Sequence, residues 1–419
     1  MMEISKQYDE ISRCGRCGFC QVACPIFRSS RHEGGVARGR LATLRAIIED
    51  RLPWSKEVEE PLFDCLLCGA CTDNCFSAIP TADLVVQARN EYLEKVGKKS
   101  IHRLLFEYLL PYPRRLHWAA RMAALGKNTG LANLAGALGL LKIFGRDFPK
   151  ANDIVDRLPS KPLRDILKPG IYEGEAEAIN IGYFVGCGVD VIQQQTGLAT
   201  FDYLKKNAKT VTILENGCCG LPAWSYGDIP IARKMAEKNL GVLSEQSLDY
   251  IVTDCSSCAA FLKKYPQLFD ENAAAKTSAD ELIPKVRDLV EIFHQFKVPG
   301  IKQAPGKLKV TYHDPCHASR GQNLVQEPRE LLKNQPGIEY VELPEADWCC
   351  GGAGSYAFSH YQLSQQVMDR KVENIKSTEA DVIATSCPAC MMHLSYGIRR
   401  HGLKIEVRHL SEIVMGKIE

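Results

Sequence analysis

An adjacent pair of cysteines followed by glycine occurs twice in the C-terminal half of this 419-residue chain, at Cys218-Cys219-Gly220 and Cys349-Cys350-Gly351. Neighbouring cysteines do not easily bond to each other, because an ordinary disulfide needs well-separated Cα atoms. Both thiolates can, however, point at one metal cluster, and the glycine lets the backbone come close to it. We therefore interpret each pair as part of a metal site.

Each pair belongs to a set of five cysteines, with a lone cysteine before the pair and a Cys-x-x-Cys motif after it. The first five-cysteine set is Cys187, Cys218, Cys219, Cys255 and Cys258, and the second five-cysteine set is Cys316, Cys349, Cys350, Cys387 and Cys390. Corresponding intervals agree within two residues, whereas buried free cysteines have no reason to repeat in register. A cubane cluster or a structural zinc needs four thiolates, so five favour a larger or more open iron-sulfur assembly.

Two runs of four cysteines near the N-terminus share the spacing Cys-x2-Cys-x2-Cys-x3-Cys. In bacterial two-cluster ferredoxins, three cysteines of one run and the last cysteine of the other hold each cubane. This pattern assigns one 4Fe-4S cluster to Cys14, Cys17, Cys20 and Cys75, and a second to Cys65, Cys68, Cys71 and Cys24. Zinc, the alternative, needs only four of these eight residues and does not explain two copies of the run.

The composition excludes several other functions. The N-terminus is polar, no run of 18 apolar residues occurs, and the net charge is +2, so we expect no secretory signal, no membrane span and no nucleic-acid partner. The 18 cysteines are grouped in tight clusters, which indicates metal binding in a reducing compartment. The glycine-rich stretch 351–354 lacks the dinucleotide fingerprint, and no nucleophile–base arrangement is visible, so we expect no catalytic residues and no flavin on this chain.

Some charged or titratable residues close to the cysteines have two explanations. His313 and His317 flank Cys316, where either could donate a hydrogen bond to cluster sulfurs or relay protons, but an ordinary loop histidine with its own partners explains each as well. Arg38 and Arg40 could balance cluster charge, or they could lie on a solvated helix face. The sequence leaves these alternatives open.

The cysteines of both sets follow segments that read as β-strands. The strands are expected at residues 179–185, 210–214 and 250–253, and again at 309–312, 339–343 and 381–385, with helices such as 228–243 and 362–375 between them. Alternating strands and helices predict parallel sheets, in which ligands bind beyond the carboxyl ends of the strands. All five cysteines of each set should therefore converge.

The remaining segments are predicted to be helical or to connect domains. An amphipathic helix at 38–48 and the wide gap between the two cysteine runs indicate a helical N-terminal module. Residues 98–146 are basic and amphipathic, are broken at Pro111 and Pro113, and could pack within the chain, meet a partner subunit or lie on a membrane surface. Residues 147–178, rich in proline, read as a linker.

These motifs together resemble a known family. The repeat is similar to the cysteine-rich CCG domain of heterodisulfide reductases, and two cubane motifs followed by two such domains resemble the glycolate oxidase iron-sulfur subunit family over nearly the whole chain. The stretches that carry this likeness include 313–317, 320–322, 349–356 and Cys387-Pro388-Ala389-Cys390. The resemblance implies a multidomain α and α/β fold: a helical dicluster ferredoxin domain at 1–97, a basic helical segment and linker at 98–178, and CCG domains with parallel sheets at 179–300 and 301–419.

The family resemblance also implies a function. It predicts an iron-sulfur electron-transfer subunit of an oxidoreductase, with two cubane 4Fe-4S clusters and two further 4Fe-4S clusters, of cubane or noncubane form, in the CCG domains. The expected partners are an FAD-linked oxidase subunit that oxidises glycolate or lactate, and an acceptor such as an electron-transfer flavoprotein or a quinone. We expect a cytoplasmic location, with a peripheral contact at the inner face of the cell membrane as an option. Both five-cysteine sets are complete, unlike in some glycolate oxidase subunits, which keeps disulfide reduction as the alternative; a structural or sensory scaffold is the least favoured.

Overall fold

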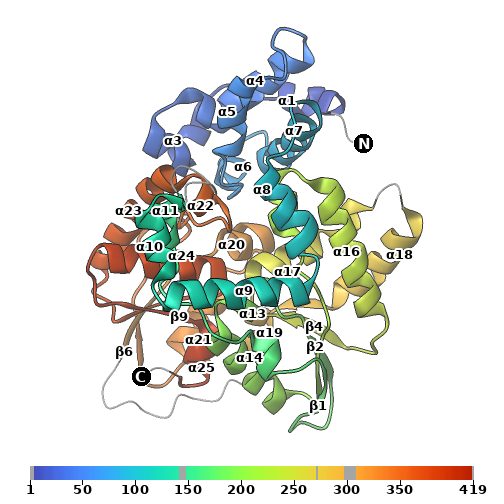
Figure 1. The fold of residues 1–419 in the computed structure, drawn as a ribbon, viewed down its shortest axis with the longest axis vertical. Helices are drawn as coiled ribbons and strands as arrows, with labels where there is room; N and C mark the ends of the chain where they lie inside the picture. The colour runs from blue at the N-terminus through green and yellow to red at the C-terminus, as the bar shows by residue number, and fades with distance from the viewer. Residues whose placement is uncertain (1–3, 141–147, 270–271, 297–307, 418–419) are drawn as a thin grey trace.

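A computed structural model describes residues 4–140, 148–269, 272–296 and 308–417. An all-helical N-terminal domain sits at one end of the molecule, and two α/β units lie side by side beneath it (Figure 1). The boundary expected between residues 300 and 301 lies outside the described residues.

The N-terminal domain is helical, as predicted. Its helices are α1 (Tyr8–Ser12), α2 (Phe19–Ala23), α3 (Pro25–Ser30), α4 (Ala37–Ile48), α5 (Glu59–Phe63), α6 (Ala70–Asp73) and α7 (Thr81–Lys95). Helix α4 confirms the helix expected at 38–48, and it buries Leu41, Leu44 and Ile47 against Leu84 and Ala88 of α7. The 3–4-residue spacing of these apolar positions places them on one face of each helix.

Two sheets, parallel except for the edge strand β1 of the first, form the centres of the α/β units, which confirms the predicted architecture. The first has the order β1 (Gly170–Glu173), β3 (Thr210–Ile213), β2 (Asn180–Tyr183), β4 (Tyr250–Thr253), β5 (Val286–Asp288). The second has the order β7 (Ile338–Tyr340), β6 (Leu308–Tyr312), β8 (Val382–Thr385), β9 (Glu406–His409). The order β3-β2-β4-β5 matches β7-β6-β8-β9, so the sequence repeat is also a structural repeat.

Strand β1 departs from the expectation of a linker at 147–178. It pairs antiparallel with β3, from Gly170 opposite Ile213 to Glu173 opposite Thr210. The strand is short and largely exposed at the sheet edge, so it lacks the buried, alternating pattern by which strands are found in a sequence. Two short helices, α11 (Phe148–Ala151) and α12 (Leu163–Ile166), also lie in this stretch.

Helices cover both sheets. In the first unit they are α13 (Cys187–Val191), α14 (Gln194–Asn207), α15 (Leu221–Tyr226), α16 (Ile229–Ser244), α17 (Ser256–Lys263), α18 (Ala273–Leu282) and α19 (Leu289–Gln295). In the second they are α20 (Cys316–Gln322), α21 (Gln326–Lys333), α22 (Tyr356–Ser359), α23 (Tyr361–Ser377), α24 (Pro388–Arg400) and α25 (Leu410–Val414). Helices α16 and α23 confirm the helices expected at 228–243 and 362–375.

The two α/β units share one hydrophobic core. Tyr183 and Val252 of the first unit belong to the same buried cluster as Tyr312 and Val382 of the second. At the junction, the Ser256 backbone N–H donates to the Ser386 carbonyl (3.1 Å) and the two hydroxyl oxygens are 2.8 Å apart. The two units therefore pack against each other through an extensive buried interface and are not independent domains joined by a linker.

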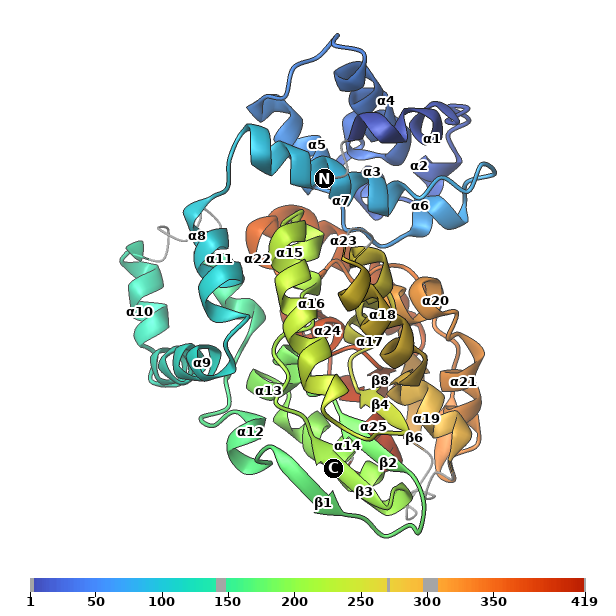
Figure 2. The ribbon, with the colours of Figure 1, turned by 90° about the vertical axis from the view of Figure 1, so that its right-hand side faces the viewer.

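The basic middle segment forms an arm beside this body (Figure 2). It contains α8 (Ser100–Arg103), a π-helical stretch (Leu104–Leu109), α9 (Pro113–Asn128) and α10 (Leu131–Ala137). The break predicted at Pro111 and Pro113 is present, and Pro113 occupies the first turn of α9, where a missing N–H costs nothing. The predicted segment continues to residue 146, and its part after residue 140 lies outside the described residues. No helix within the described ranges is long and apolar enough to span a bilayer.

Arg89 of α7 fastens the N-terminal domain to the first α/β unit. Its guanidinium is buried and donates to the carbonyls of Leu62 (2.7 Å), Cys65 (2.7 Å) and Ser225. Ser225 lies in α15, and Gly227 directly follows that helix. A Cβ atom added at Gly227 would approach the Cβ of Arg89 to 2.4 Å. One cation thus holds the loop before a cysteine run against a second domain.

Replacing Arg89 by Lys should destabilise the protein by about 3 kcal/mol, because lysine cannot reproduce the fork and leaves buried carbonyls without donors. Urea unfolding at equilibrium would measure this loss. Arg51→Lys is the matched control, since the Arg51 side chain is 64% exposed and should tolerate the change. Equal stability of the two variants would contradict this role of Arg89.

Candidate metal centres

The second five-cysteine set converges at the carboxyl ends of its strands, as the sequence predicted. Cys316 begins α20 after β6, the pair follows β7, and Cys387 precedes α24 after β8. The thiols contact one another in the order Cys316, Cys349, Cys350, Cys390, Cys387. All five come together in a largely buried group.

The first five-cysteine set has the same arrangement. The Sγ atoms of Cys187 and Cys218 are 3.8 Å apart, and the contacts continue through Cys219 and Cys258 to Cys255. Cys255 then contacts Cys387 of the second set. Ten thiols therefore form one continuous row across the junction of the two α/β units. The sequence predicted two separate sites and gave no sign that they adjoin.

The two N-terminal cysteine runs have matching loop conformations. In the first, Arg16 (φ 54°) and Gly18 (φ 91°) have left-handed backbones, and in the second Leu67 (φ 54°) and Gly69 (φ 77°) do. These turns bend successive cysteines toward a common point. The thiols of Cys24, Cys65 and Cys71 interact electrostatically, as do those of Cys14 and Cys20, while Cys14 and Cys75 pack against one hydrophobic cluster. The Cys20 thiol also interacts with Cys24, so these contacts do not separate the two predicted ligand sets, and the assignment of each ligand stays a prediction.

Arg40 lies inside the domain next to the second of these groups. Its side chain is 2% exposed, which excludes the solvated-face explanation for this residue, and its Nε donates to the Pro61 carbonyl at 2.5 Å. Burial opposes the charge, but the Cys65, Cys24 and Cys71 thiols hold the pKa of Arg40 above its ordinary value. Arg38, by contrast, is paired at the surface with Glu33. A buried guanidinium beside thiolates offsets the negative charge of a bound cluster.

The N-terminal domain meets the second five-cysteine set directly. Cys68 packs in the same hydrophobic cluster as Cys349, and burial together with that thiol raises the pKa of Cys68 well above its ordinary value. Arg320 bridges the two domains: its Nε lies 3.0 Å from the Asp73 carboxylate, and its Nη1 donates to the Asp347 carbonyl at 3.0 Å. Arg320 belongs to the stretch 320–322 that carries the family likeness, but its bridging role depends on domain packing and has no local signal in the sequence.

Backbone amides point at the sulfurs of the second cysteine pair. The N–H groups of Gly351 and Gly352 donate to Cys349 Sγ and Cys350 Sγ, each at 3.4 Å. A Cβ at Gly351 would lie 2.7 Å from the Ser364 carbonyl oxygen, and Gly351 has a φ of +80°, so a larger residue would displace the loop. Glycine at this position therefore lets the loop pack closely against α23, and the expected approach of the backbone to a cluster stays a prediction.

The pKa values of the thiols within each of the two sets are shifted in opposite directions. Three of the thiols, Cys219, Cys349 and Cys387, accept hydrogen bonds from neighbouring thiols, which lowers their pKa values. The pKa of Cys219 falls to about 5. The pKa values of Cys187 and Cys390 are raised, and the largest cause is the contact with Cys218 for Cys187 and with Cys350 for Cys390. Ten largely buried thiols at contact distance cannot all ionise unless a cation compensates them. This soft, crowded donor set fits iron-sulfur clusters, whose iron atoms supply that charge.

One lysine and one histidine, both buried, lie beside the second set. Lys371 is fully buried and donates to the Glu345 and Ala346 carbonyls, and burial lowers its pKa to about 8. Helical spacing from Met368 and Ile375 places it on the buried face of α23, a signal that was present in the sequence. His313 is 1% exposed, and burial lowers its pKa to about 3. His317, in contrast, has a partner in Ser257 Oγ at 3.2 Å.

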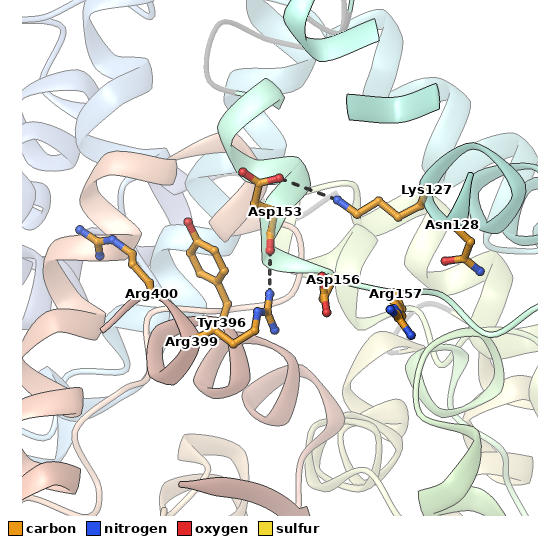
Figure 3. A pocket seen from close by; sticks show the side chains of 8 residues that line it. All are labelled: Lys127, Asn128, Asp153, Asp156, Arg157, Tyr396, Arg399 and Arg400. Carbon is orange, nitrogen blue, oxygen red and sulfur yellow. Dashed lines mark hydrogen bonds and ion pairs between the residues drawn. The ribbon is translucent and has the colours of Figure 1, made fainter. Parts of the chain in front are cut away.

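A pocket of about 440 Å³ lies away from the cysteines, between the arm and α24 (Figure 3). Asp153 stands between two cations there: its carboxylate is 3.8 Å from Lys127 Nζ, and its carbonyl accepts from Arg399 at 2.9 Å. The lining is polar and mainly basic, and it includes none of the predicted site residues.

Comparison with known proteins gives the same division of the chain. A family model described as a cysteine-rich domain matches residues 181–263 and 310–395. A 4Fe-4S dicluster domain matches 10–79, and the linker region of the glycolate oxidase iron-sulfur subunit matches 97–154. These matches support 4Fe-4S clusters in this protein.

This chain covers most or all of the length of several similar proteins. A probable glycolate oxidase iron-sulfur subunit of Bacillus subtilis is 29% identical over 97% of this chain and 94% of that protein. Lactate utilization protein A of Bacillus licheniformis is 31% identical over 56% of this chain and 99% of its own length. A fumarate reductase (CoM/CoB) subunit of Methanothermobacter marburgensis is 26% identical over 96% of this chain and 71% of its own length.

A hypothetical protein from Helicobacter pylori of known structure has a similar fold, with a TM-score of 0.55, 9% identity, and coverage of all of this chain and 74% of the other. The sequence matches indicate an iron-sulfur electron-transfer subunit associated with an oxidoreductase. The chain belongs to the family of proteins like the glycolate oxidase iron-sulfur subunit.

Proposed function

We propose that this chain is the iron-sulfur subunit of an FAD-dependent dehydrogenase complex that oxidises a 2-hydroxy acid such as glycolate or lactate. A partner flavoprotein binds the FAD and the acid, and this chain carries the electrons onward to an acceptor such as an electron-transfer flavoprotein or a quinone. The observation that carries the proposal is the unbroken series of thiols from the N-terminal domain through Cys68 and Cys349 to Cys255 and Cys187. Two of its relatives are named for glycolate oxidation and for lactate utilization.

The cysteines hold four clusters in this proposal. The N-terminal ligands are Cys14, Cys17, Cys20 and Cys75 for one cubane, and Cys65, Cys68, Cys71 and Cys24 for the other; each five-cysteine set holds a further 4Fe-4S cluster, of noncubane form. When bound, such clusters accept and release single electrons. The protein contributes their spacing, the buried charges of Arg40 and Lys371, and a water-poor surround.

Adding glycolate or lactate to the complex with its flavoprotein should reduce the clusters of this chain, because the flavin can pass its electrons one at a time. Loss of visible cluster absorbance on substrate addition measures this reduction. About sixteen irons per chain are expected for four four-iron clusters. If dithionite reduces the clusters but no 2-hydroxy acid does so in the presence of the flavoprotein, the proposal is wrong.

Disulfide reduction at the five-cysteine sets is the second candidate function. Both sets are complete and adjoin at Cys255 and Cys387, so a disulfide bound at the junction could meet two clusters. One relative is named as part of a fumarate reductase (CoM/CoB). In this case the substrate would be reduced to two thiols by electrons that arrive through the chain.

This alternative predicts thiol formation from a disulfide with an artificial electron donor, and loss of at least about tenfold in rate in Cys350→Ala or Cys219→Ala, since each removes a cluster ligand. Cys17→Ala is the control, because an artificial donor can bypass the N-terminal clusters and turnover should persist. Absence of turnover in the wild-type protein would eliminate the alternative.

We also propose that the arm binds the inner face of the cell membrane. Exposed apolar side chains lie along α9 and α10: Trp118, Met122, Leu125, Leu131, Leu134 and Leu138. Their exposure argues against packing within the chain. Exposed Arg114 and Arg115 lie on the same helix, and residues 98–121 hold six lysines and arginines against one acidic residue. Leucine and tryptophan beside arginine suit an interfacial helix on anionic lipid.

Removing both charges, in Arg114→Gln with Arg115→Gln, should weaken binding to phosphatidylglycerol-containing vesicles at least about tenfold, because each charge near the surface contributes about 1 kcal/mol. Vesicle co-sedimentation measures this. Ile171→Ser, at another exposed apolar residue, should leave binding unchanged. Equal binding to neutral vesicles would show that the arginines do not contribute, and absence of vesicle binding together with capture of the arm by the flavoprotein would show that the face serves a protein partner.

A further inference from the structure

The two five-cysteine sets differ at one equivalent position. His313 and Phe184 each lie three residues before the lone cysteine and directly after the central strand. Their backbone N–H groups make matching bonds, from His313 to the Ala384 carbonyl (2.9 Å) and from Phe184 to the Val252 carbonyl (2.8 Å). The structural repeat therefore places an imidazole on one set where it places a phenyl ring on the other.

The surroundings of the two side chains differ accordingly. Phe184 is fully buried in the apolar cluster that contains Cys218, Cys219, Cys255 and Cys258. His313 is 1% exposed, and neither ring nitrogen has a hydrogen-bond partner among the described residues. A ring nitrogen of His313 and the sulfurs of Cys350 and Cys390 all lie within 4.8 Å of one another. The unpartnered imidazole is thus next to the cluster ligands.

A buried imidazole without any partner is costly, so a native protein supplies one. Nearby His393 has its own, since its Nδ1 is 2.8 Å from the Cys350 carbonyl and its Nε2 is 3.0 Å from Ser364 Oγ. Among the described residues His313 has no such partner, whereas sulfur atoms occupy the space in front of it. Five thiolates already serve the second set, so a sixth donor is not needed as a ligand.

We propose that His313 donates a hydrogen bond to sulfur at the second five-cysteine set, and that this bond gives the cluster held there a higher reduction potential than its twin. This inference rests on the proposed function, in which each set holds a cluster. Hydrogen bonds to cluster sulfurs stabilise the added negative charge of the reduced form. The first set, with Phe184, receives no such bond at this position.

A second difference acts in the same direction. Lys371 of α23 donates to the Glu345 and Ala346 carbonyls just before the second cysteine pair. In the corresponding helix α16, Asn239 secures the first pair by donating to the Cys218 carbonyl (2.9 Å). A buried amino group thus stands beside the second cysteine pair where a neutral amide stands beside the first. Electrons that arrive by way of Cys68 settle on this set before they reach the first.

His313→Phe, which copies the first set, tests the proposal in the holoprotein. An EPR-monitored redox titration should show one cluster with a potential lowered by about 59 mV, a tenfold change in its one-electron equilibrium constant. The signal is assigned to the second set by its loss in Cys350→Ala. His313→Gln, which keeps an N–H donor, should recover part of the shift. The reciprocal Phe184→His should raise the potential of the first-set cluster, and this measurement remains if His313→Phe fails to fold.

Two results would overturn the inference. One is an unchanged potential in both His313→Phe and Phe184→His, and the other is loss of iron from the second set in His313→Gln, which would make His313 a ligand. If no cluster signal of the wild-type protein disappears in Cys350→Ala, the proposed cluster at the second set is refuted. Iron analysis of the same samples separates that outcome from a failed hydrogen bond.

Discussion

Ten largely buried thiols in contact with one another impose the strongest electrostatic demand on this fold. Cys187 and Cys218 have their sulfurs 3.8 Å apart, and the row that begins there runs through both sets to Cys316. Negative charge at such density is tolerated in a low-dielectric interior only with compensating cations. The fold supplies Arg40 and Lys371 close to the thiols, while cluster iron supplies the larger share in our proposal. Parallel sheets suit this purpose because three strands of each sheet lead to cysteines at the same edge: β2, β3 and β4 in the first sheet, and β6, β7 and β8 in the second.

Internal repetition explains both the symmetry and its exceptions. Each repeat fastens the loop before its cysteine pair through a residue of the following helix, Asn239 in one and Lys371 in the other. Each repeat also sends a tyrosine hydroxyl from its central strand toward the junction, where Tyr183 meets Asp254 and Tyr312 meets Ser386. The backbone is shared, so differences of charge at equivalent positions are the means by which two similar sites acquire different properties.

Much of the fold and of the ligand grouping was predictable because strand ends and cysteine spacings are local signals. Apolar strands that end a few residues before a cysteine determine where the thiols meet. The adjoining of Cys255 and Cys387 was not predictable, since it depends on how two complete domains pack. The burial of Arg40 was equally hidden, because the helix that carries it also exposes arginines at the surface. Strand β1 was missed because an exposed edge strand needs only a neighbouring strand with free backbone hydrogen-bonding groups. It needs no alternating hydrophobic pattern in its own sequence.

The order of the sites in space differs from their order in the chain, and this explains why the middle segment is long. The N-terminal domain contacts the second set through Cys68 and Arg320, although the first set follows it in sequence. The chain must therefore leave the N-terminal domain and travel along the molecule to the far edge of the first sheet, where α12 and β1 lie (Figure 2). Helices α8 and α9 cover this distance outside the body. This connection still packs against the body on one face, since Phe106 belongs to the buried hydrophobic cluster that contains Phe184 of the first unit, whereas exposed side chains such as Trp118 leave its other face available for contact with another surface.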